Sequence, residues 1–96
     1  MNITLIPQRR DDALVVTKNG DTLTINGEVF DFSVIPDGAT LPASAVNCEY
    51  LAGDVERVNG VLHLALLLPT GPDASPAANF PNPIINPADG ALELPT

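Results

Sequence analysis

Three Asn-Gly dipeptides constrain the fold of this chain more than any other feature. They lie at residues 19–20, 26–27 and 59–60, and each is flanked by β-branched or alternating apolar and polar residues. Both central positions of a two-residue type I′ turn need a positive φ, which Asn and Gly tolerate, so the pattern predicts tight β-hairpins. Helical apolar spacing is repeatedly interrupted by Gly or Pro. The chain is therefore expected to be all-β.

The first two turns predict registers that agree with each other. A turn at the first Asn-Gly pairs Val16 with Leu23 and Leu14 with Ile25, and a turn at the second pairs Leu23 with Phe30. Cross-strand partners share a face, so both turns place the same apolar residues on one side of a three-stranded meander. That side comprises Leu14, Val16, Leu23, Ile25, Phe30 and Phe32.

The second half of the chain predicts a similar meander. A turn at the third Asn-Gly pairs Glu56 with His63, and a turn at 53–54 pairs Tyr50 with Arg57. With a first strand near the N-terminus, at residues 2–6, and a crossing loop at 35–45, the two meanders predict a small antiparallel β-sandwich or a partly open barrel.

The composition changes after residue 68. We therefore divide the chain into a β domain, 1–68, and a C-terminal arm, 69–96, which holds seven of the ten prolines. Such a run cannot be a helix or a central strand, so the arm is expected to be extended. It could add as a strand to a neighbouring subunit or to its own domain. Spaced apolar residues make it a predicted partner contact: Phe80, Ile84, Ile85, Leu92 and Leu94.

Two adjacent arginines, Arg9 and Arg10, precede Asp11 and Asp12. They could pair locally with these aspartates. Alternatively, they could project into an acidic groove of a partner, because the arginine fork suits protein interfaces. Both readings remain open from the sequence, and the arginines complete the predicted contact residues.

The charge balance excludes several classes of partner. Twelve acidic residues face four basic ones, for a net charge of −8. So few cations cannot neutralise a row of phosphates or bind an anionic membrane surface, and neither nucleic acid nor membrane is an expected partner. The acidity suits a soluble protein. It would also suit a protein that mimics nucleic acid toward a basic protein.

No catalytic, metal or cofactor site is expected. The single histidine, His63, is predicted on the face opposite to that of the single cysteine, Cys48, which argues against a thiol nucleophile and its base. One His and one Cys cannot build a tetrahedral zinc site. The acidic pairs lack the regular oxygen spacing of a calcium loop. We therefore expect a binding protein without enzyme activity.

The cysteine count and the hydropathy predict a cytoplasmic origin. Cys48 cannot form an internal disulfide, which fits folding in a reducing compartment. The N-terminus has no apolar segment typical of a signal peptide, and the longest apolar run, 64–68, is far too short to span a membrane.

Several segments carry a resemblance to a known group of proteins. They are residues 2–12 (NITLIPQRRDD), 25–33 (INGEVFDFS), 53–69 (GDVERVNGVLHLALLLP), 80–84 (FPNPI) and 92–95 (LELP). Together they resemble short, uncharacterised proteins encoded among the tail genes of tailed bacteriophages and prophages of the siphophage-like type. These motifs are turn and strand patterns, and none is a catalytic signature.

The resemblance implies a virion tail or baseplate component made in the cytoplasm of a bacterial host, which would bind other tail or baseplate proteins. Self-association is left open. Two alternatives remain: an acidic inhibitor that mimics nucleic acid toward a basic host protein, and a chaperone of tail-fibre assembly that is absent from the finished virion.

Overall fold

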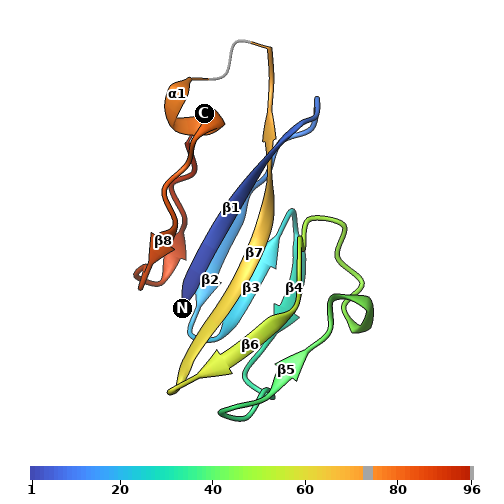
Figure 1. The fold of residues 1–96 in the computed structure, drawn as a ribbon, viewed down its shortest axis with the longest axis vertical. Coiled ribbons are helices and arrows are strands. Elements are labelled where there is room, and N and C mark those ends of the chain that lie inside the picture. Colours follow the sequence, from blue (N-terminus) through green and yellow to red (C-terminus); the bar gives the residue numbers. More distant parts are fainter. Residues whose placement is uncertain (73–74, 96) are drawn as a thin grey trace.

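The computed structural model describes residues 1–72 and 75–95, and these residues form nine strands, a short 3₁₀ turn and one short helix (Figure 1). The strands are β1 Asn2–Arg9, β2 Val16–Asn19, β3 Thr22–Ile25, β4 Glu28–Asp31, β5 Thr40–Leu41, β6 Val55–Val58, β7 Val61–Thr70, β8 Ile84–Ile85 and β9 Gly90–Ala91. The 3₁₀ turn is Ala43–Ala45, and the helix α1 is Pro76–Asn79.

Two sheets pack against each other. The first, sheet A, has the strand order β5-β6-β7-β1-β8, and the second, sheet B, has the order β4-β3-β2-β9. In Figure 1 the strands β1 and β7 of sheet A lie in front of the strands of sheet B. The apolar side chains between the sheets form one core. Its residues that are at most 1% exposed are Ile3, Val16, Leu23, Val55, Leu62, Leu66 and Ala78. The predicted small all-β fold with a largely aliphatic core is confirmed.

The first predicted meander is present, with one change of register. Strand β3 pairs with β4 as expected, with Leu23 opposite Phe30, across a turn in which both Asn26 and Gly27 have positive φ. In the β2–β3 hairpin, however, Val16 pairs with Ile25. The turn there is Gly20-Asp21, with a positive φ at Gly20, as a type II′ turn requires at its first central position. This shift of two residues preserves the alternation, so the predicted face remains buried.

Pairing in the second half differs from the prediction. The β6–β7 hairpin has the expected register, with Glu56 opposite His63. The other neighbour of β6 is the short strand β5. The segment before β6 makes a 3₁₀ turn, held by a hydrogen bond from the Ala43 amide to the Asp54 carboxylate at 2.8 Å, and then a single bridge between Leu51 and Leu66. This 3₁₀ turn lies in the predicted crossing loop, whereas the predicted hairpin at 53–54, with Tyr50 opposite Arg57, is not formed: Arg57 pairs with Leu62, and the segment before β6 instead bridges β7 at Leu51.

The long strand β7 organises sheet A. It runs through Pro69 to Thr70, two residues beyond the predicted end of the β domain, and pairs in parallel with β1 over eight positions. This parallel pairing joins the two ends of the β domain, a contact that no local turn signal encodes. Along β7, buried even-numbered residues alternate with half-buried odd-numbered ones over the whole strand.

The extended C-terminal segment folds back on its own domain. Strand β8 pairs antiparallel with β1, and β9 pairs antiparallel with β2, so each sheet gains one edge strand from this segment. Between β7 and β8, the short helix begins after Ser75, whose hydroxyl accepts a hydrogen bond from the Ala78 amide, and Ala78 is 1% exposed. Of the two placements that the sequence leaves open for the arm, residues 75–95 adopt the one on their own chain.

Candidate protein-binding surface

The outer face of sheet A is defined by strand alternation. In β7 the buried residues point toward sheet B, so the alternate residues point away from it. The parallel register then places the matching residues of β1 on the same side, for example Ile6 beside Leu67. We call this surface the outer face. It comprises Asn2, Thr4, Ile6 and Gln8 of β1, Thr40 of β5, Glu56 and Val58 of β6, Val61, His63, Ala65, Leu67 and Pro69 of β7, and Ile85 of β8.

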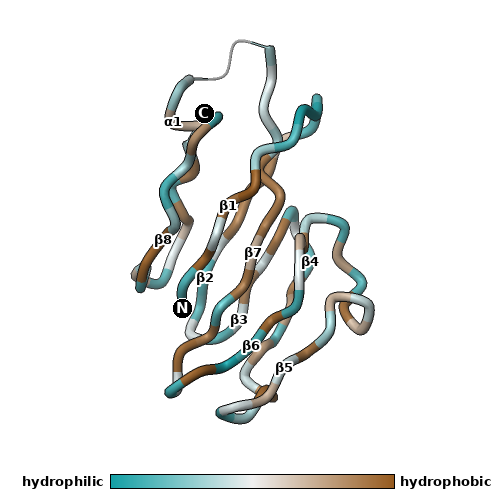
Figure 2. The backbone as a smooth tube through the Cα atoms, viewed as in Figure 1, coloured by the Kyte–Doolittle hydropathy of each residue, from teal (hydrophilic) through white to brown (hydrophobic). Residues whose placement is uncertain are grey.

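Apolar side chains run across this surface from β8 to β6 although it faces solvent. Ile6 is 42% exposed, Val58 43% and Ile85 62%. No segment among residues 1–72 and 75–95 lies across it, and it faces the reader in Figures 1 and 2. Contiguous exposed apolar patches on soluble proteins mark sites of interaction. The outer face is therefore the strongest candidate for a binding surface in the described part of the chain.

The strand β7 carries a signal for this surface that our sequence reasoning did not use. Residues 64–68 are apolar at every position, whereas a strand with one face in water alternates apolar and polar residues. A strand that is apolar on both sides is typical of a sheet covered on both faces. In this chain the core covers one face of β7 and leaves the other open.

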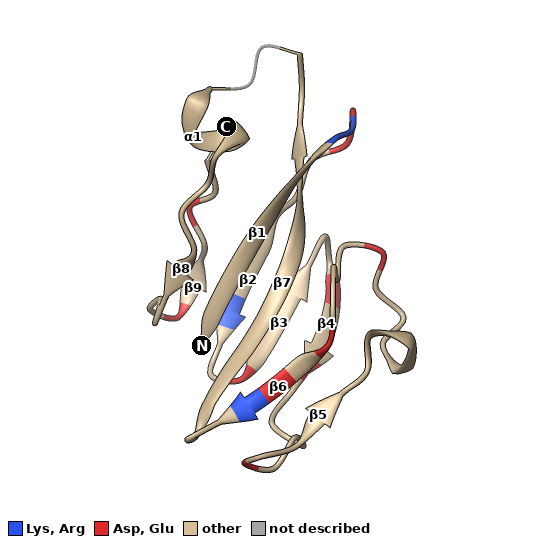
Figure 3. Ribbon diagram, in the orientation of Figure 1, with Lys and Arg blue, Asp and Glu red and all other residues tan. Residues whose placement is uncertain are grey.

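The outer face is also poor in charge. Among the described acidic residues only Glu56 belongs to it, and this residue pairs across the strands with His63. Figure 3 shows most of the other carboxylates in turns, in loops and on sheet B. The high negative charge of the chain is therefore directed away from the apolar surface.

Most described carboxylates bind groups of their own chain. Asp37 accepts a hydrogen bond from the Gly60 amide at 2.9 Å. Asp89 accepts from the Lys18 ammonium at 2.8 Å and from the Gly20 amide at 3.0 Å, which lowers the pKa of Asp89, chiefly through the lysine. Further carboxylates with internal hydrogen bonds are Asp12, Asp21, Asp31, Glu49 and Asp54. They act as anchors for turns and loops.

The predicted contact residues of the arm have different surroundings. Phe80 and Ile85 are 83% and 62% exposed, respectively. Ile84, Leu92 and Leu94 are half-buried and pack against the core. These three face their own domain, so only Phe80 and Ile85 keep most of their side chains free for a partner.

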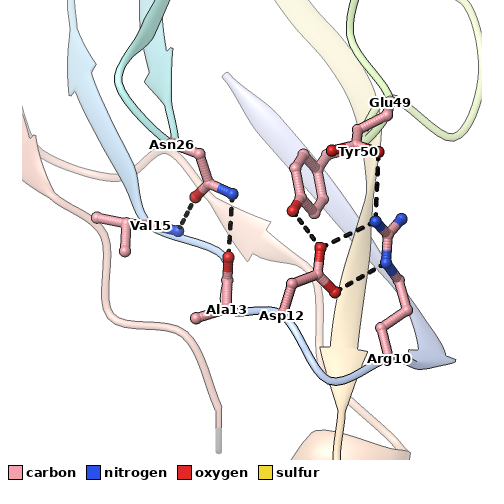
Figure 4. Close-up of polar contacts among 7 residues, drawn as sticks. All are labelled: Arg10, Asp12, Ala13, Val15, Asn26, Glu49 and Tyr50. Atoms are coloured by element: carbon pink, nitrogen blue, oxygen red, sulfur yellow. Dashed lines mark hydrogen bonds and ion pairs between the residues drawn. The ribbon is translucent and has the colours of Figure 1, made fainter.

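The two arginines also differ. Arg9 is exposed at the end of β1, whereas Arg10 is half-buried and binds its own chain. The Arg10 guanidinium donates two hydrogen bonds of 2.9 Å to the Asp12 carboxylate and one of 3.3 Å to Glu49, and it lies 4.9 Å from the ring centroid of Tyr50 (Figure 4). Arg10 thus adopts the local pairing, and it also makes a cation–π contact with Tyr50.

Asp12 links this cluster to the core. The Tyr50 hydroxyl donates a hydrogen bond to the Asp12 carboxylate, and Tyr50 itself is 6% exposed. This bond, assisted by Arg10, lowers the pKa of Asp12 below its ordinary value. The same bond raises the pKa of Tyr50. These contacts hold the β1–β2 connection against the loop before β6.

Asn26 has a second structural role that sequence reasoning missed. Besides its positive φ in the β3–β4 turn, its side chain accepts a hydrogen bond from the Val15 amide at 2.7 Å and donates one to the Ala13 carbonyl at 3.0 Å (Figure 4). A side-chain amide that binds both an N–H and a C=O replaces a missing strand neighbour. It fixes the segment that leads into β2.

Residues that could suggest chemistry lie apart. His63 belongs to the outer face, and Cys48 packs against the core on the other side of the sheet. Within the described ranges, no three side chains of His, Cys, Asp or Glu gather as metal ligands. No helix in those ranges is long and apolar enough to cross a membrane.

An apolar cavity of about 400 Å³ lies where the end of β7 meets the C-terminal segment. Leu14, Leu68, Ala78 and Leu94 contribute to its wall, with the prolines that flank Thr70 and Leu94 nearby. The charged residue along its wall is Asp12, whose carboxylate is already bound by Tyr50 and Arg10. The cavity therefore offers shape and apolar contact, without a polar group positioned for chemistry.

In comparisons with protein-family models, curated proteins and solved structures, nothing matches the chain.

Proposed function

We propose that the chain is a structural component of a bacteriophage tail or baseplate and acts by binding other proteins through the outer face of sheet A. One observation carries the binding role: this face is apolar, poor in charge and uncovered by residues 1–72 and 75–95. The phage setting comes from the resemblance of the strand and turn motifs described above.

The outer face, and not the C-terminal arm that the sequence predicts, is the partner-binding surface in this proposal. Ile84, Leu92 and Leu94 are occupied by their own domain. Ile85 lies next to β1 at the margin of the outer face, and it extends the apolar surface sideways. A partner that covers sheet A would therefore bury part of the C-terminal segment without displacing it.

The distribution of carboxylates favours this role over mimicry of nucleic acid. A mimic needs free carboxylates in rows, at spacings like those of phosphates. Most carboxylates in the described part of the chain are engaged in hydrogen bonds or ion pairs with it. Those without such a contact there are Asp11, Glu28, Glu56 and Glu93, which lie in four separate segments.

The test is the protein composition of purified particles of a phage that encodes the chain. We expect quantitative mass spectrometry to find it at a constant ratio to the tail proteins. A second phage, in which Val58→Lys places a charge on the outer face, should incorporate much less of it. Val29→Lys, on the outer side of sheet B, is the matched control.

Three results would contradict the proposal. Complete absence of the chain from particles would exclude a structural role, and fibreless particles after gene deletion would then support an assembly chaperone. Capture of a nuclease or a polymerase from host lysate, with no virion protein, would support nucleic-acid mimicry. Equal incorporation of the Val58→Lys and Val29→Lys variants would show that the chain does not bind its partners through the outer face.

A further inference from the structure

We propose that the outer face of sheet A binds the same face of a second copy of this chain, so that two sandwiches stack into a symmetrical dimer. The inference rests on the proposed binding role of that face and names its partner. In a two-fold dimer the same patch serves on both subunits, so one surface must be complementary to itself.

Charge is the first argument for a second copy. Two chains that each carry a net charge of −8 repel one another at most orientations. The outer face carries one carboxylate, Glu56, with His63 beside it, so stacking through this face adds the least repulsion. A basic partner, in contrast, would bind a surface rich in carboxylates. Most carboxylates of this chain lie outside the outer face (Figure 3). The chemistry of the face therefore calls for an uncharged, apolar partner, which the chain itself provides.

Size is the second argument. Strand β1 has eight residues and β7 has ten. At about 3.3 Å per residue they are roughly 26 and 33 Å long, and neighbouring strands lie about 4.8 Å apart. The other three strands of sheet A have only two, four and two residues, so the face offers roughly 400 Å² per copy, or about 800 Å² for the two copies together. Specific, stable interfaces bury about 1,200–2,000 Å² in total and transient ones less, so we expect a weak, readily dissociable dimer.

Shape is the third argument. The outer face has the side chains of a regular sheet, and two sheets pack face to face about 10 Å apart when their side chains are apolar and of medium size. Ile6, Val61 and Leu67 are of this kind. The small side chain of Ala65, which lies between them, leaves space for a larger side chain of the facing sheet. The outer side of sheet B is less suited, because its strands present Thr17, Thr22 and Thr24 there.

Sedimentation equilibrium of the full chain, from about 5 to 200 μM, tests the proposal. We expect a monomer–dimer equilibrium that tightens about threefold or more between 0.05 and 0.5 M NaCl, because salt screens the repulsion of two acidic copies while apolar contacts persist. Ile6→Lys and Val58→Lys should each weaken the dimer at least about tenfold, since each buries an unpaired charge.

Val29→Lys is the matched control, because it adds the same charge to an exposed strand residue outside the outer face. It should leave the dimer as tight as in the parent chain or slightly tighter. Far-UV circular dichroism and thermal unfolding establish that each variant is folded. Val58→Lys lies at the end of β6, so it tests the face even if Ile6→Lys unfolds the chain.

A monomer at all concentrations and salts would overturn the proposal. So would a dimer that salt loosens, or one that Val29→Lys weakens as much as Val58→Lys does. Dimerisation and the proposed tail role can fail separately. If the chain is monomeric in solution but present in particles, only the proposed dimer is wrong. If it is dimeric in solution but absent from particles, only the proposed structural role is wrong.

Discussion

Arg57 connects the two sheets, and its removal is the sharpest test of how the sandwich is held together. The residue belongs to β6 of sheet A, and its side chain is 13% exposed. Its Nε donates a hydrogen bond to the Ile35 carbonyl at 2.6 Å, and Nη2 donates to the Asp21 carboxylate at 2.9 Å. Two longer bonds, of 3.3 and 3.4 Å, reach the carbonyls of Gly60 and Phe32. One guanidinium thus binds the β6–β7 turn, the β2–β3 turn and the loop after β4.

The cost of Arg57→Met follows from these contacts. Methionine retains the apolar stem but leaves the Ile35 carbonyl without its charged donor, which costs about 1.5–3 kcal/mol. The ion pair adds about 0–1 kcal/mol, because Asp21 is 41% exposed and can be hydrated. We expect a loss of about 2–3 kcal/mol in the free energy of unfolding. The total is about 5–14 kcal/mol for a domain of this length, so the change is a substantial fraction of it.

Urea unfolding followed by far-UV circular dichroism measures this loss, since the chain has no tryptophan. Arg9→Met is the matched control, because Arg9 is exposed and its side chain makes no hydrogen bond or ion pair within residues 1–72 and 75–95. Arg57→Lys should fall between the two, since an ammonium can keep the ion pair but not the whole fork. If Arg57→Met and Arg9→Met unfold within about 0.5 kcal/mol of each other, the surface-substitution range, the bridge between the sheets has no energetic role.

The remaining predictions concern packing, turns and acid. Leu66→Ala should destabilise the fold by about 3–5 kcal/mol in urea, because Leu66 is 0% exposed, and Leu67→Ala on the outer face by clearly less; equal losses would contradict the assigned faces. Gly60→Ala should lower the melting temperature, since Gly60 has φ +79°, whereas Gly71→Ala should be nearly neutral; the reverse order would contradict the turn. Asp89 has a lowered pKa in the folded state, so its contribution is present above its unfolded pKa and is lost as the pH falls through the folded pKa. Asp89→Asn should therefore reduce the drop in melting temperature between pH 6 and pH 3, and an unchanged drop would contradict the ion pair with β2.

The short-range features of the fold could be predicted from the sequence. The Asn26-Gly27 and Asn59-Gly60 turns have positive φ at both residues, and the strands beside them have the expected registers. The first hairpin turn lies at Gly20-Asp21, one residue after the predicted Asn19-Gly20. A type II′ turn needs a positive φ only at its first central residue, and Gly20 supplies it without Asn19. The buried face survived this shift because strand alternation has a period of two.

The long-range features could not be predicted in this way. The parallel pairing of β1 with β7 depends on residues about 60 positions apart, and no local turn specifies it. The 3₁₀ turn before β6 donates a hydrogen bond to the side chain of a residue 11 positions away, Asp54, besides its own backbone hydrogen bonds. The return of the C-terminal segment to the two sheet edges depends on the open edges of β1 and β2, which exist only once the sheets have formed.

The candidate site was only partly accessible from the sequence. Apolar spacing predicted five partner contacts in the C-terminal segment. Phe80 and Ile85 are exposed, whereas Ile84, Leu92 and Leu94, which have the same spacing, pack on their own core. Spacing alone does not distinguish a residue that binds a partner from one that binds its own domain. The outer face required the register of β7 with β1, although the unbroken apolar run in β7 was visible beforehand.

Site-specific photo-cross-linking in assembled particles, or in cells that produce them, tests the central claim most directly. A photoreactive phenylalanine derivative replaces Ile6, on the outer face, or Val29, on the opposite side of the sandwich. Our account predicts a strong cross-link from position 6, either to a tail protein or to a second copy, and little or none from position 29. Cross-links from position 29 with none from position 6 would show that the chain binds through another surface.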